Sequence, residues 1–197
     1  MRIVAGELRG RRLRGADHLR PTGERTRAAL FDILGGDVGG TFVDLFAGVG
    51  SVGLEAVSRG ARAILVDRDP RSLEVMEENV LELGVSEDVE IVDSDAFRYA
   101  KLAPGCTEPV PIVFADPPYD HPAMDKLLRV LSRSPLVDLG TRIVLQHGRD
   151  RKPGRKAPDL ELQRQVRHGD AVLSFFSLTR EAADARARGD ASPADDG

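Results

Sequence analysis

The chain has 197 residues, a formal net charge of −4, one cysteine and no tryptophan. Its length suits one α/β domain with short additions, and its one cysteine, Cys106, excludes an internal disulfide and a metal site built on several cysteines. No apolar stretch is long enough to cross a membrane or to form the core of a secretion signal, and a reducing cytoplasm fits the cysteine usage, so we expect a cytoplasmic protein with no membrane partner.

The charge is distributed unevenly along the chain. Residues 1–27 hold eight arginines against three acidic residues, a net charge of +5, which leaves −9 on the other 170 residues. A basic arm on an acidic body suggests a polyanionic partner, although a solvated arm with incidental arginines would show the same pattern.

The first part of the chain predicts an arm followed by a helix. Residues 1–14 alternate weakly between apolar and polar residues and contain glycines, which is typical of a short hairpin or extended ribbon. We expect Thr22 to be the N-cap of an amphipathic helix that carries Glu24 in its first turn and ends at Gly35-Gly36. Arginines at the start of this helix would lie near free backbone N–H groups, an arrangement that suits a phosphate.

Apolar runs alternate with helical segments through the rest of the chain. Five strands are expected at 42–46, 64–66, 89–92, 112–115 and 142–145. This alternation predicts a doubly wound α/β fold with right-handed crossovers. Segments 160–167 and 171–178 predict a closing hairpin, which should place an antiparallel strand beside the fifth one. Residues 180–197 show no periodic apolar face, and we expect them to be disordered.

A glycine-rich loop follows the first predicted strand. Gly48, Gly50 and Gly53 have the G-x-G-x-x-G spacing between a strand and a helix, and Asp67 lies 19 residues after Gly48. In dinucleotide-binding folds a carboxylate at about this distance meets ribose hydroxyls. Asp67 could instead cap a helix or lie in a turn, although Asp69 is the better candidate for the cap.

The fourth predicted strand ends in Asp116-Pro117-Pro118-Tyr119. Neither proline can continue a strand, because each lacks an N–H and fixes φ at about −65°. The strand end therefore presents acceptors, which are the Asp116 carboxylate and nearby main-chain carbonyls, beside the flat ring of Tyr119. A planar molecule with an amino group fits these acceptors, with its ring stacked on Tyr119. The simpler interpretation is a turn, since Asp-Pro is common in turns.

Two cofactors could occupy the glycine loop. A nicotinamide cofactor would account for the glycines and Asp67, but it leaves Asp116–Tyr119 unexplained, and no residue pair for hydride chemistry is evident. S-adenosyl-L-methionine fits better, because its carboxylate can meet the loop N–H groups while Asp44 accepts from its ammonium and Asp67 from its ribose. Asp95 and Ala96 would lie beside the adenine, although Asp95 is equally suited to cap the following helix.

Seven motifs, taken together, carry a family resemblance. They are Met1-Arg2-Ile3-Val4-Ala5-Gly6, Arg9-Gly10-Arg11, Leu19-Arg20-Pro21-Thr22, Arg25-Thr26-Arg27, Asp44-Leu45-Phe46-Ala47-Gly48-Val49-Gly50, Gly53-Leu54-Glu55-Ala56 and Asp116-Pro117-Pro118-Tyr119. They resemble the bacterial ribosomal small subunit methyltransferase D family, from residue 1 to about 178. The resemblance implies a Rossmann-like class I S-adenosylmethionine-dependent methyltransferase fold with a short N-terminal arm and a C-terminal antiparallel β-hairpin. It also implies methylation of a guanine N2 amine in 16S rRNA.

The resemblance also implies roles for individual residues. The expected catalytic residues are Asp116, Pro117, Pro118 and Tyr119. The expected cofactor contacts are Asp44, Phe46, Ala47, Gly48, Gly50, Gly53, Asp67, Asp95, Ala96 and Asp116. The expected RNA contacts are Arg2, Arg9, Arg11, Arg20, Thr22, Arg25 and Arg27. The partner would be 16S rRNA, free or within an assembling small subunit, and we expect a monomer with an RNA-contacting segment at 1–38, a methyltransferase domain at 39–179 and a disordered tail. A methyl group on a sulfonium needs only an in-line nucleophile, so we expect no metal.

Two departures from the family pattern bear on substrate roles. His168-Gly169-Asp170-Ala171 stands where the family tends to show Tyr-Gly-Asp-Thr, and Gln146-His147 stands where an acid is expected. We expect both histidines to be structural or at the surface.

Three other functions remain open at the level of sequence. A DNA methyltransferase would be expected to have a separate target-recognition domain, and a protein amine methyltransferase more often presents Asn-Pro-Pro-Tyr. An RNA-binding assembly protein without turnover is the third, and the intact glycine loop and Asp116 argue against it.

Overall fold

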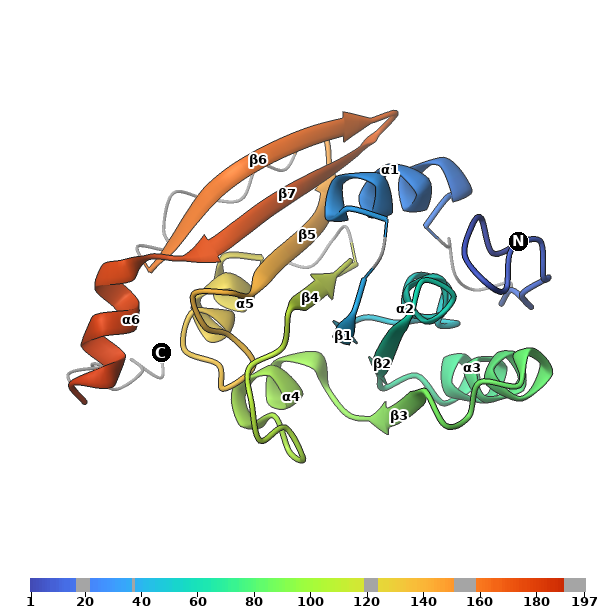
Figure 1. Cartoon of the computed structure of the whole chain (residues 1–197), viewed down its shortest axis with the longest axis horizontal. Coiled ribbons are helices and arrows are strands. Elements are labelled where there is room, and N and C mark those ends of the chain that lie inside the picture. The colour runs from blue at the N-terminus through green and yellow to red at the C-terminus, as the bar shows by residue number, and fades with distance from the viewer. Residues whose placement is uncertain (17–21, 37, 119–123, 151–158, 190–197) are drawn as a thin grey trace.

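The computed structural model describes residues 1–16, 22–36, 38–118, 124–150 and 159–189. Within these ranges the strands form one seven-stranded sheet in the order β3-β2-β1-β4-β5-β7-β6 (Figure 1). The strands are β1 (Gly40–Asp44), β2 (Ala61–Asp67), β3 (Val89–Asp93), β4 (Ile112–Ala115), β5 (Arg142–Gly148), β6 (Leu160–His168) and β7 (Ala171–Leu178). The first five pair in parallel, and β7 pairs antiparallel with both β5 and β6. The predicted doubly wound, Rossmann-like fold and its closing hairpin are confirmed.

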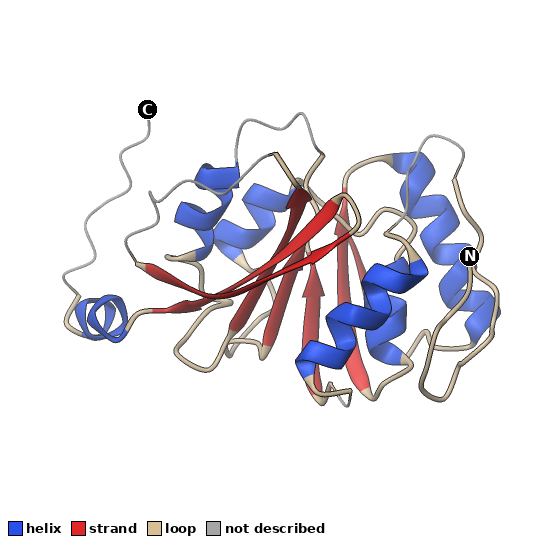
Figure 2. Cartoon of the chain, turned by 90° about the horizontal axis from the view of Figure 1, so that it is seen from above, coloured by secondary structure: helices blue, strands red, loops and turns tan. Residues whose placement is uncertain are grey.

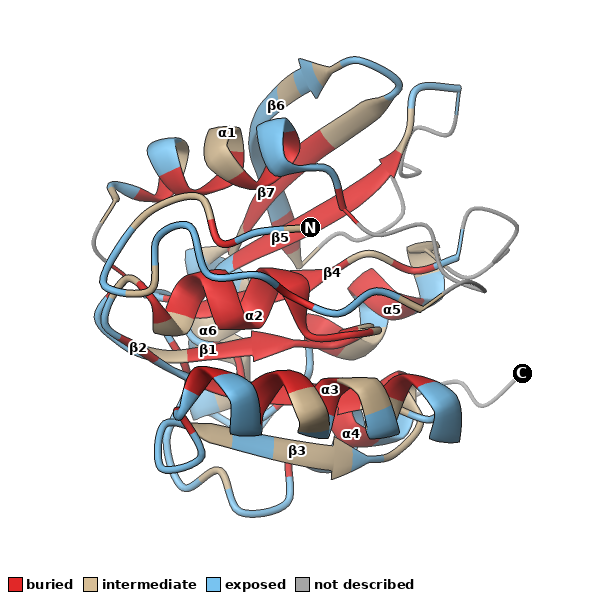
Figure 3. Cartoon of the chain, turned by 90° about the vertical axis from the view of Figure 1, so that its right-hand side faces the viewer, coloured by how far each residue is buried: buried red, intermediate tan, exposed pale blue. Residues whose placement is uncertain are grey.

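Helices cover both faces of the sheet (Figure 2). They are α1 (Glu24–Leu34), α2 (Ser51–Val57), α3 (Pro70–Leu83), α4 (Ala96–Leu102), α5 (Met124–Leu131) and α6 (Arg180–Ala187). Strand β4 is apolar throughout because it is covered by helices on both faces. Its residues Ile112 and Phe114 pack in the cluster of α1 and α2. The alternating residues Val113 and Ala115 pack in the cluster of α4 and α5. Figure 3 shows the central strands and the inward sides of α2 and α3 buried.

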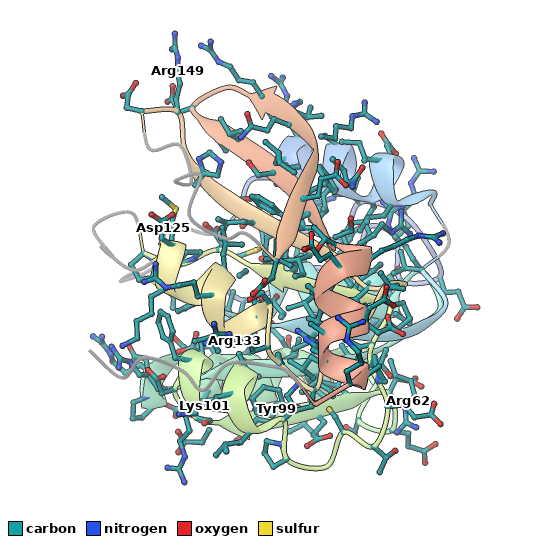
Figure 4. The ribbon with its side chains drawn as sticks, turned by 90° about the vertical axis from the view of Figure 1, so that its left-hand side faces the viewer. Arg62, Tyr99, Lys101, Asp125, Arg133 and Arg149 are labelled. Atoms are coloured by element: carbon teal, nitrogen blue, oxygen red, sulfur yellow. The ribbon has the colours of Figure 1, made fainter. Side chains whose placement is uncertain are left out.

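Helix α4 brings Tyr99 against the chain's one cysteine. The Tyr99 ring is buried on the inner side of α4 (Figure 4), and its hydroxyl oxygen lies 3.5 Å from the Cys106 sulfur. Cys106 is a free thiol, as the cysteine count required. No helix in the described ranges is both long enough and apolar enough to span a membrane.

The N-terminal arm is a ribbon that packs on the body. Arg2 and Arg12 form an antiparallel bridge, and the Ile3 N–H donates to the Arg11 carbonyl at 3.0 Å, which confirms the predicted hairpin. Ile3 is buried against the α3 side of the sheet. Gly6 has φ +82°, and a Cβ there would lie 1.7 Å from the Ser58 carbonyl oxygen, so the turn of the arm requires glycine.

The N-cap of helix α1 lies one residue after the predicted cap, Thr22. Its N-cap is Gly23, which has no side chain to accept a hydrogen bond, and the Thr22 hydroxyl instead donates to Asp116. The helix ends as predicted at Gly35, which has φ +106°. Helix α1 also joins the core, because Phe31 stacks near Phe42 with ring centroids 5.9 Å apart.

The expectation of disorder from residue 180 onward is wrong for the part that the structure describes. Residues 180–187 form α6, which Thr179 caps by accepting from the Ala182 N–H at 3.2 Å. The helix buries none of its residues and is attached through Arg186, which donates to the Val137 carbonyl at 2.9 Å. The prediction of disorder depended on the absence of a periodic apolar face, but an alanine-rich surface helix forms without such a face. The rest of the expected tail, residues 190–197, lies outside the described residues.

Candidate active site

One cavity of about 450 Å³ opens at the carboxyl ends of β1, β2 and β4. Its size is in the range of small-molecule and cofactor sites, roughly 300–1,000 Å³. The predicted residues that line it are Asp44, Phe46, Ala47, Gly48, Asp67, Asp95, Ala96, Asp116, Pro117, Pro118 and Thr22. The glycine loop and the Asp-Pro-Pro corner therefore share one cavity, because both follow parallel strands of the same sheet.

Asp44 ends β1 and is almost completely buried. Its Oδ2 accepts from the Gly53 N–H at 3.2 Å, and its Oδ1 has no hydrogen-bond partner among the described residues. Burial raises the pKa of Asp44 to about 7, and the charge of Asp116 adds to this rise. A buried carboxylate oxygen without a donor is suited to a ligand that brings one, such as an ammonium group.

Asp67 ends β2 and shapes the glycine loop. Its Oδ2 accepts from the Gly48 N–H at 2.7 Å, and its Oδ1 accepts from the N–H groups of Arg68 and Asp69. Asp67 is not a helix cap: the N-cap of α3 is Asp69, as expected. Each carboxylate oxygen can accept more than one hydrogen bond, so Asp67 keeps capacity for a ligand hydroxyl.

The three glycines of the loop have different roles. Gly48 lies in the cavity wall with φ +55°. Gly50 and Gly53 lie outside the residues that line the cavity, and their assignment as cofactor contacts stays a prediction. A Cβ on Gly53 would lie 2.1 Å from the Leu65 side chain, so this glycine lets α2 pack closely on β2. Gly50 has φ +81° at the N-cap of α2.

Asp95 is the N-cap of α4, which was one of its two expected roles. Its Oδ1 accepts from the N–H groups of Phe97 and Arg98 at 3.0 and 3.1 Å. Its Oδ2 forms an ion pair with Arg68 at 3.2 Å. Asp95 and Ala96 also line the cavity, so capping and a ligand contact are compatible at this position.

Asp116 follows β4 and is held by two side chains from other parts of the chain. Its Oδ2 accepts from the Thr22 hydroxyl at 3.1 Å and from the Gln146 amide at 2.5 Å. Burial raises the pKa of Asp116 to about 7, while the hydrogen bond from Thr22 lowers it. Pro117 and Pro118 line the cavity beside it, and Tyr119 lies outside the described residues.

The structure separates the arginines that were expected to contact RNA. Arg2, Arg9, Arg11 and Arg25 are exposed, whereas Arg20 lies outside the described residues. Arg27 is fully buried, which corrects its assignment. Its guanidinium donates to the Thr22 carbonyl at 2.7 Å and to the Arg2 carbonyl at 2.5 Å. Thr22 is also buried, at 8% exposure, and its hydroxyl donates to Asp116 in the cavity wall, so an RNA contact at Thr22 would have to be made within the cavity and stays a prediction.

Glu55 is a structural residue that the sequence patterns did not single out for this role. It is fully buried in α2 and accepts from the N–H groups of Val4 and Ala5 at 2.8 and 2.9 Å. Arg59 pairs with it at 3.1 Å, and the Arg27 Nε lies 3.8 Å away. Glu55 therefore fastens the arm to the body. The available signal was an acidic residue within the buried start of a helix.

Neither His147 nor His168 lies in the cavity wall. His147 is buried in β5, where its Nε2 lies 2.7 Å from the Ser174 hydroxyl and its Nδ1 lies 2.9 Å from the Gly148 carbonyl. His168 ends β6 and is half-buried. The expectation of a structural role is confirmed for His147.

Comparisons with known proteins cover both the arm and the sheet. A family model described as conserved hypothetical protein 95 matches residues 1–177. The putative rRNA methyltransferase YlbH of Bacillus subtilis is 30% identical over 180 residues, which are 89% of this chain and 98% of that protein. The ribosomal RNA small subunit methyltransferase D of Escherichia coli K12 is 36% identical over 135 residues, 66% of each chain.

Solved structures show the same architecture. The putative methyltransferase yhhF from Escherichia coli has a TM-score of 0.77 at 27% identity and covers 90% of this chain and 97% of its own. An RNA methyltransferase from Salinibacter ruber, solved in complex with S-adenosyl-L-homocysteine, has a TM-score of 0.62 at 19% identity and covers 82% of this chain and 95% of its own. The fold is thus that of the class I methyltransferases.

Proposed function

Because the chain belongs to the ribosomal RNA small subunit methyltransferase D family, we propose that it methylates the exocyclic N2 amine of a guanine in 16S rRNA and uses S-adenosyl-L-methionine as the methyl donor. The observation that carries the proposal is the shared cavity, in which the glycine loop and the Asp116 corner face the same space. A donor bound by the loop and an amine bound by the corner would then be neighbours.

The charges of the cavity favour a cationic ligand. Asp44, Asp67, Asp95 and Asp116 line it, and the one basic side chain in its described wall is Arg68, which is paired with Asp95. S-adenosyl-L-methionine carries a sulfonium and an ammonium group, which such a site attracts. Asp44 Oδ1, which has no partner among the described residues, would accept from the ammonium. Asp67 would accept from the ribose hydroxyls, and Asp95 with Ala96 would adjoin the adenine.

When bound, S-adenosyl-L-methionine supplies a methyl group that is activated by its sulfonium. The residues of this chain orient the acceptor. Asp116 and the Pro117 carbonyl would accept the two hydrogens of the guanine amine, which fixes the orientation of a nitrogen that is a poor nucleophile. Asp116 would then take the proton that the amine loses. Its pKa of about 7 suits proton exchange at neutral pH. Tyr119 would stack on the base.

The exposed arginines of the arm would hold the RNA. Arg2, Arg9, Arg11 and Arg25 are exposed, and the proposal extends to Arg20. Met1 and Ala16 of the arm line the cavity, so a strand of RNA on the arm would pass close to the site. The target base must leave its stack to enter. We accordingly assign RNA contact to residues 1–38 and methyl transfer to residues 39–179, in a protein that acts as a monomer without a metal.

Transfer of radiolabelled methyl groups tests the proposal. Purified 16S rRNA, small-subunit particles lacking the modification, double-stranded DNA and a ribosomal protein mixture would each be offered as substrates. The expected result is label in RNA or in particles, released as N2-methylguanosine on digestion to nucleosides. Label in DNA or protein, or no label with any substrate, would overturn it.

A further inference from the structure

The two oxygens of the Asp116 carboxylate have different surroundings. Oδ2 accepts both hydrogen bonds, from Thr22 at 3.1 Å and from Gln146 at 2.5 Å. Among the described residues, nothing donates to Oδ1. Two donors on one oxygen fix the rotation of the carboxylate, so Oδ1 is the oxygen that stays free to accept from a ligand.

Gln146 is placed by the sheet. It lies in β5, whose neighbour β4 ends one residue before Asp116, and it is only 4% exposed. Its amide nitrogen contacts Asp116 and, at 3.4 Å, the Thr22 hydroxyl, but its Oε1 is buried without a partner among the described residues. A buried carbonyl oxygen without a donor costs free energy. Strand packing alone would be better served by an apolar side chain, so the amide nitrogen is the part of Gln146 that the site uses.

The backbone of Thr22 is held in place by a hydrogen bond from Arg27. Its carbonyl accepts from Arg27 Nη1 at 2.7 Å, and Arg27 is itself buried between Thr22, the Arg2 carbonyl and Glu55. Thr22 therefore reaches Asp116 from a fixed backbone. Three segments that are far apart in the sequence, the approach to α1, the end of β4 and strand β5, meet at one carboxylate oxygen.

We propose that Thr22 and Gln146 are positioning residues for methyl transfer, which act on the acceptor amine through Asp116. Their hydrogen bonds direct Oδ1 toward the substrate and favour the ionised form of the carboxylate, because both donors stabilise negative charge on Oδ2. The proposal rests on the proposed function, since it assigns Asp116 the role of amine acceptor. Neither residue needs to touch the base or the methyl donor.

Variants that remove only the donors test this. Thr22→Val and Gln146→Leu keep the approximate shape and lose the hydrogen bonds, whereas Thr22→Ser keeps the hydroxyl. We expect kcat for methyl transfer at pH 7 to fall roughly 10- to 100-fold in the first two, with KM for S-adenosyl-L-methionine changed less than about twofold, because positioning and not binding is lost. Thr22→Ser should restore most of the rate.

The dependence of the rate on pH separates positioning from a merely structural role. Loss of either donor raises the pKa of Asp116, so the acid limb of the kcat profile should move to higher pH and the deficit should shrink above pH 8. Gln146→Glu would place a second carboxylate beside Oδ2 and should shift the limb furthest. Gln163→Glu, on the exposed face of β6 where Gln163 bonds Ser177, makes the same change away from the cavity and should leave the profile in place.

The carboxyl titration of Asp116, followed by NMR in the cofactor-free protein, gives a readout that does not depend on activity. The other titratable groups on the residues that line the cavity are the Met1 α-amino group, Asp44, Asp67, Asp69, Asp95 and Arg68, so the titration is best made in an Asp44→Asn background. An upward shift in Thr22→Val and Gln146→Leu supports the action of both donors on Asp116 independently of turnover, whereas a wild-type protein that methylates no RNA would refute the proposed function and with it the role of these residues in methyl transfer. An unshifted Asp116 titration, or equal loss of kcat at every pH, would overturn it.

Discussion

Asp44 ends β1 and Asp116 follows the adjacent parallel strand β4, and the charge of Asp116 adds to burial in raising the pKa of Asp44 to about 7. Burial also raises the pKa of Asp116 to about 7. Two carboxylates that would each be more stable when neutral thus face one cavity. This arrangement costs stability in the empty protein, and a cationic ligand would offset that cost.

The first prediction concerns stability against pH. Both folded-state pKa values lie above the ordinary value of 3.8, so these groups contribute stability that is fully present below pH 3.8 and is lost as pH rises through about 7. Asp44→Asn should therefore be more stable than the wild type at pH 8, by roughly 1–4 kcal/mol, and nearly equal to it at pH 4. Urea unfolding at the two pH values measures this. A wild type as stable as Asp44→Asn at pH 8 would contradict the burial of this charge.

The second prediction concerns cofactor affinity. Binding of S-adenosyl-L-methionine should strengthen between pH 6 and 8, because the ammonium group requires ionised Asp44. Asp44→Asn should weaken binding roughly 10- to 100-fold, the range expected when a charge-assisted hydrogen bond of about 1.5–3 kcal/mol is lost. Isothermal titration calorimetry gives the affinity and, in buffers of different ionisation enthalpy, the protons released. Asp88 is an exposed acid that directly precedes β3, and the control variant Asp88→Asn should bind normally.

The third prediction separates chemistry from binding at Asp116. Asp116→Ala should lower kcat by at least about 100-fold while S-adenosyl-L-methionine still binds, since the acceptor of the amine hydrogens is lost and the loop is intact. Single-turnover assays with preformed cofactor complex measure the step directly. Turnover within a few fold of the wild type would rule out Asp116 as the acceptor.

The fourth prediction compares arginines that differ in exposure. Replacing Arg2, Arg9 and Arg25 with Gln should weaken RNA binding and reduce the slope of log K against log salt by up to about 2, because each phosphate contact with single-stranded RNA contributes about 0.7. Arg62→Gln is a matched control. Arg62 is exposed near the amino end of β2, whereas the cavity lies at the carboxyl ends of the strands. Figure 4 shows Arg62 on the other side of the molecule from Arg149, which directly follows β5. An equal effect of Arg62→Gln would mean that the arm is not the RNA surface.

The fifth prediction concerns the attachment of the arm. Glu55→Gln should destabilise the protein by about 3–5 kcal/mol, because it leaves the buried Arg27 without its compensating charge. Glu78→Gln removes one of the two exposed partners of Arg14, of which Glu82 remains, and should cost less than about 1 kcal/mol. Urea unfolding of both variants gives the two changes in unfolding free energy. Similar changes in Glu55→Gln and Glu78→Gln would mean that Glu55 does not fasten the arm to the body.

Much of the fold could be predicted from the sequence, because its signals are local. The alternation of apolar strands and amphipathic helices required only the periods of side-chain direction, and Gly35 and Gly84 ended their helices by adopting positive φ. The prolines after Asp116 stopped β4. Because β1 and β4 are parallel, the glycine loop and the Asp116-Pro117-Pro118 segment that follow them open into one cavity. The short helix α6 was missed because it has no apolar period.

Only the tertiary structure showed which residues of one type are exposed and which are buried. Arg25 and Arg27 stand two positions apart, yet Arg25 is exposed while Arg27 is buried beside Glu55, which comes 28 residues later in the chain. The contact of Gln146 with Asp116 likewise depends on the register of β4 against β5. Whether a polar side chain is solvated, paired or aimed at a ligand depends on neighbours from distant segments, and the local pattern of a sequence does not contain them.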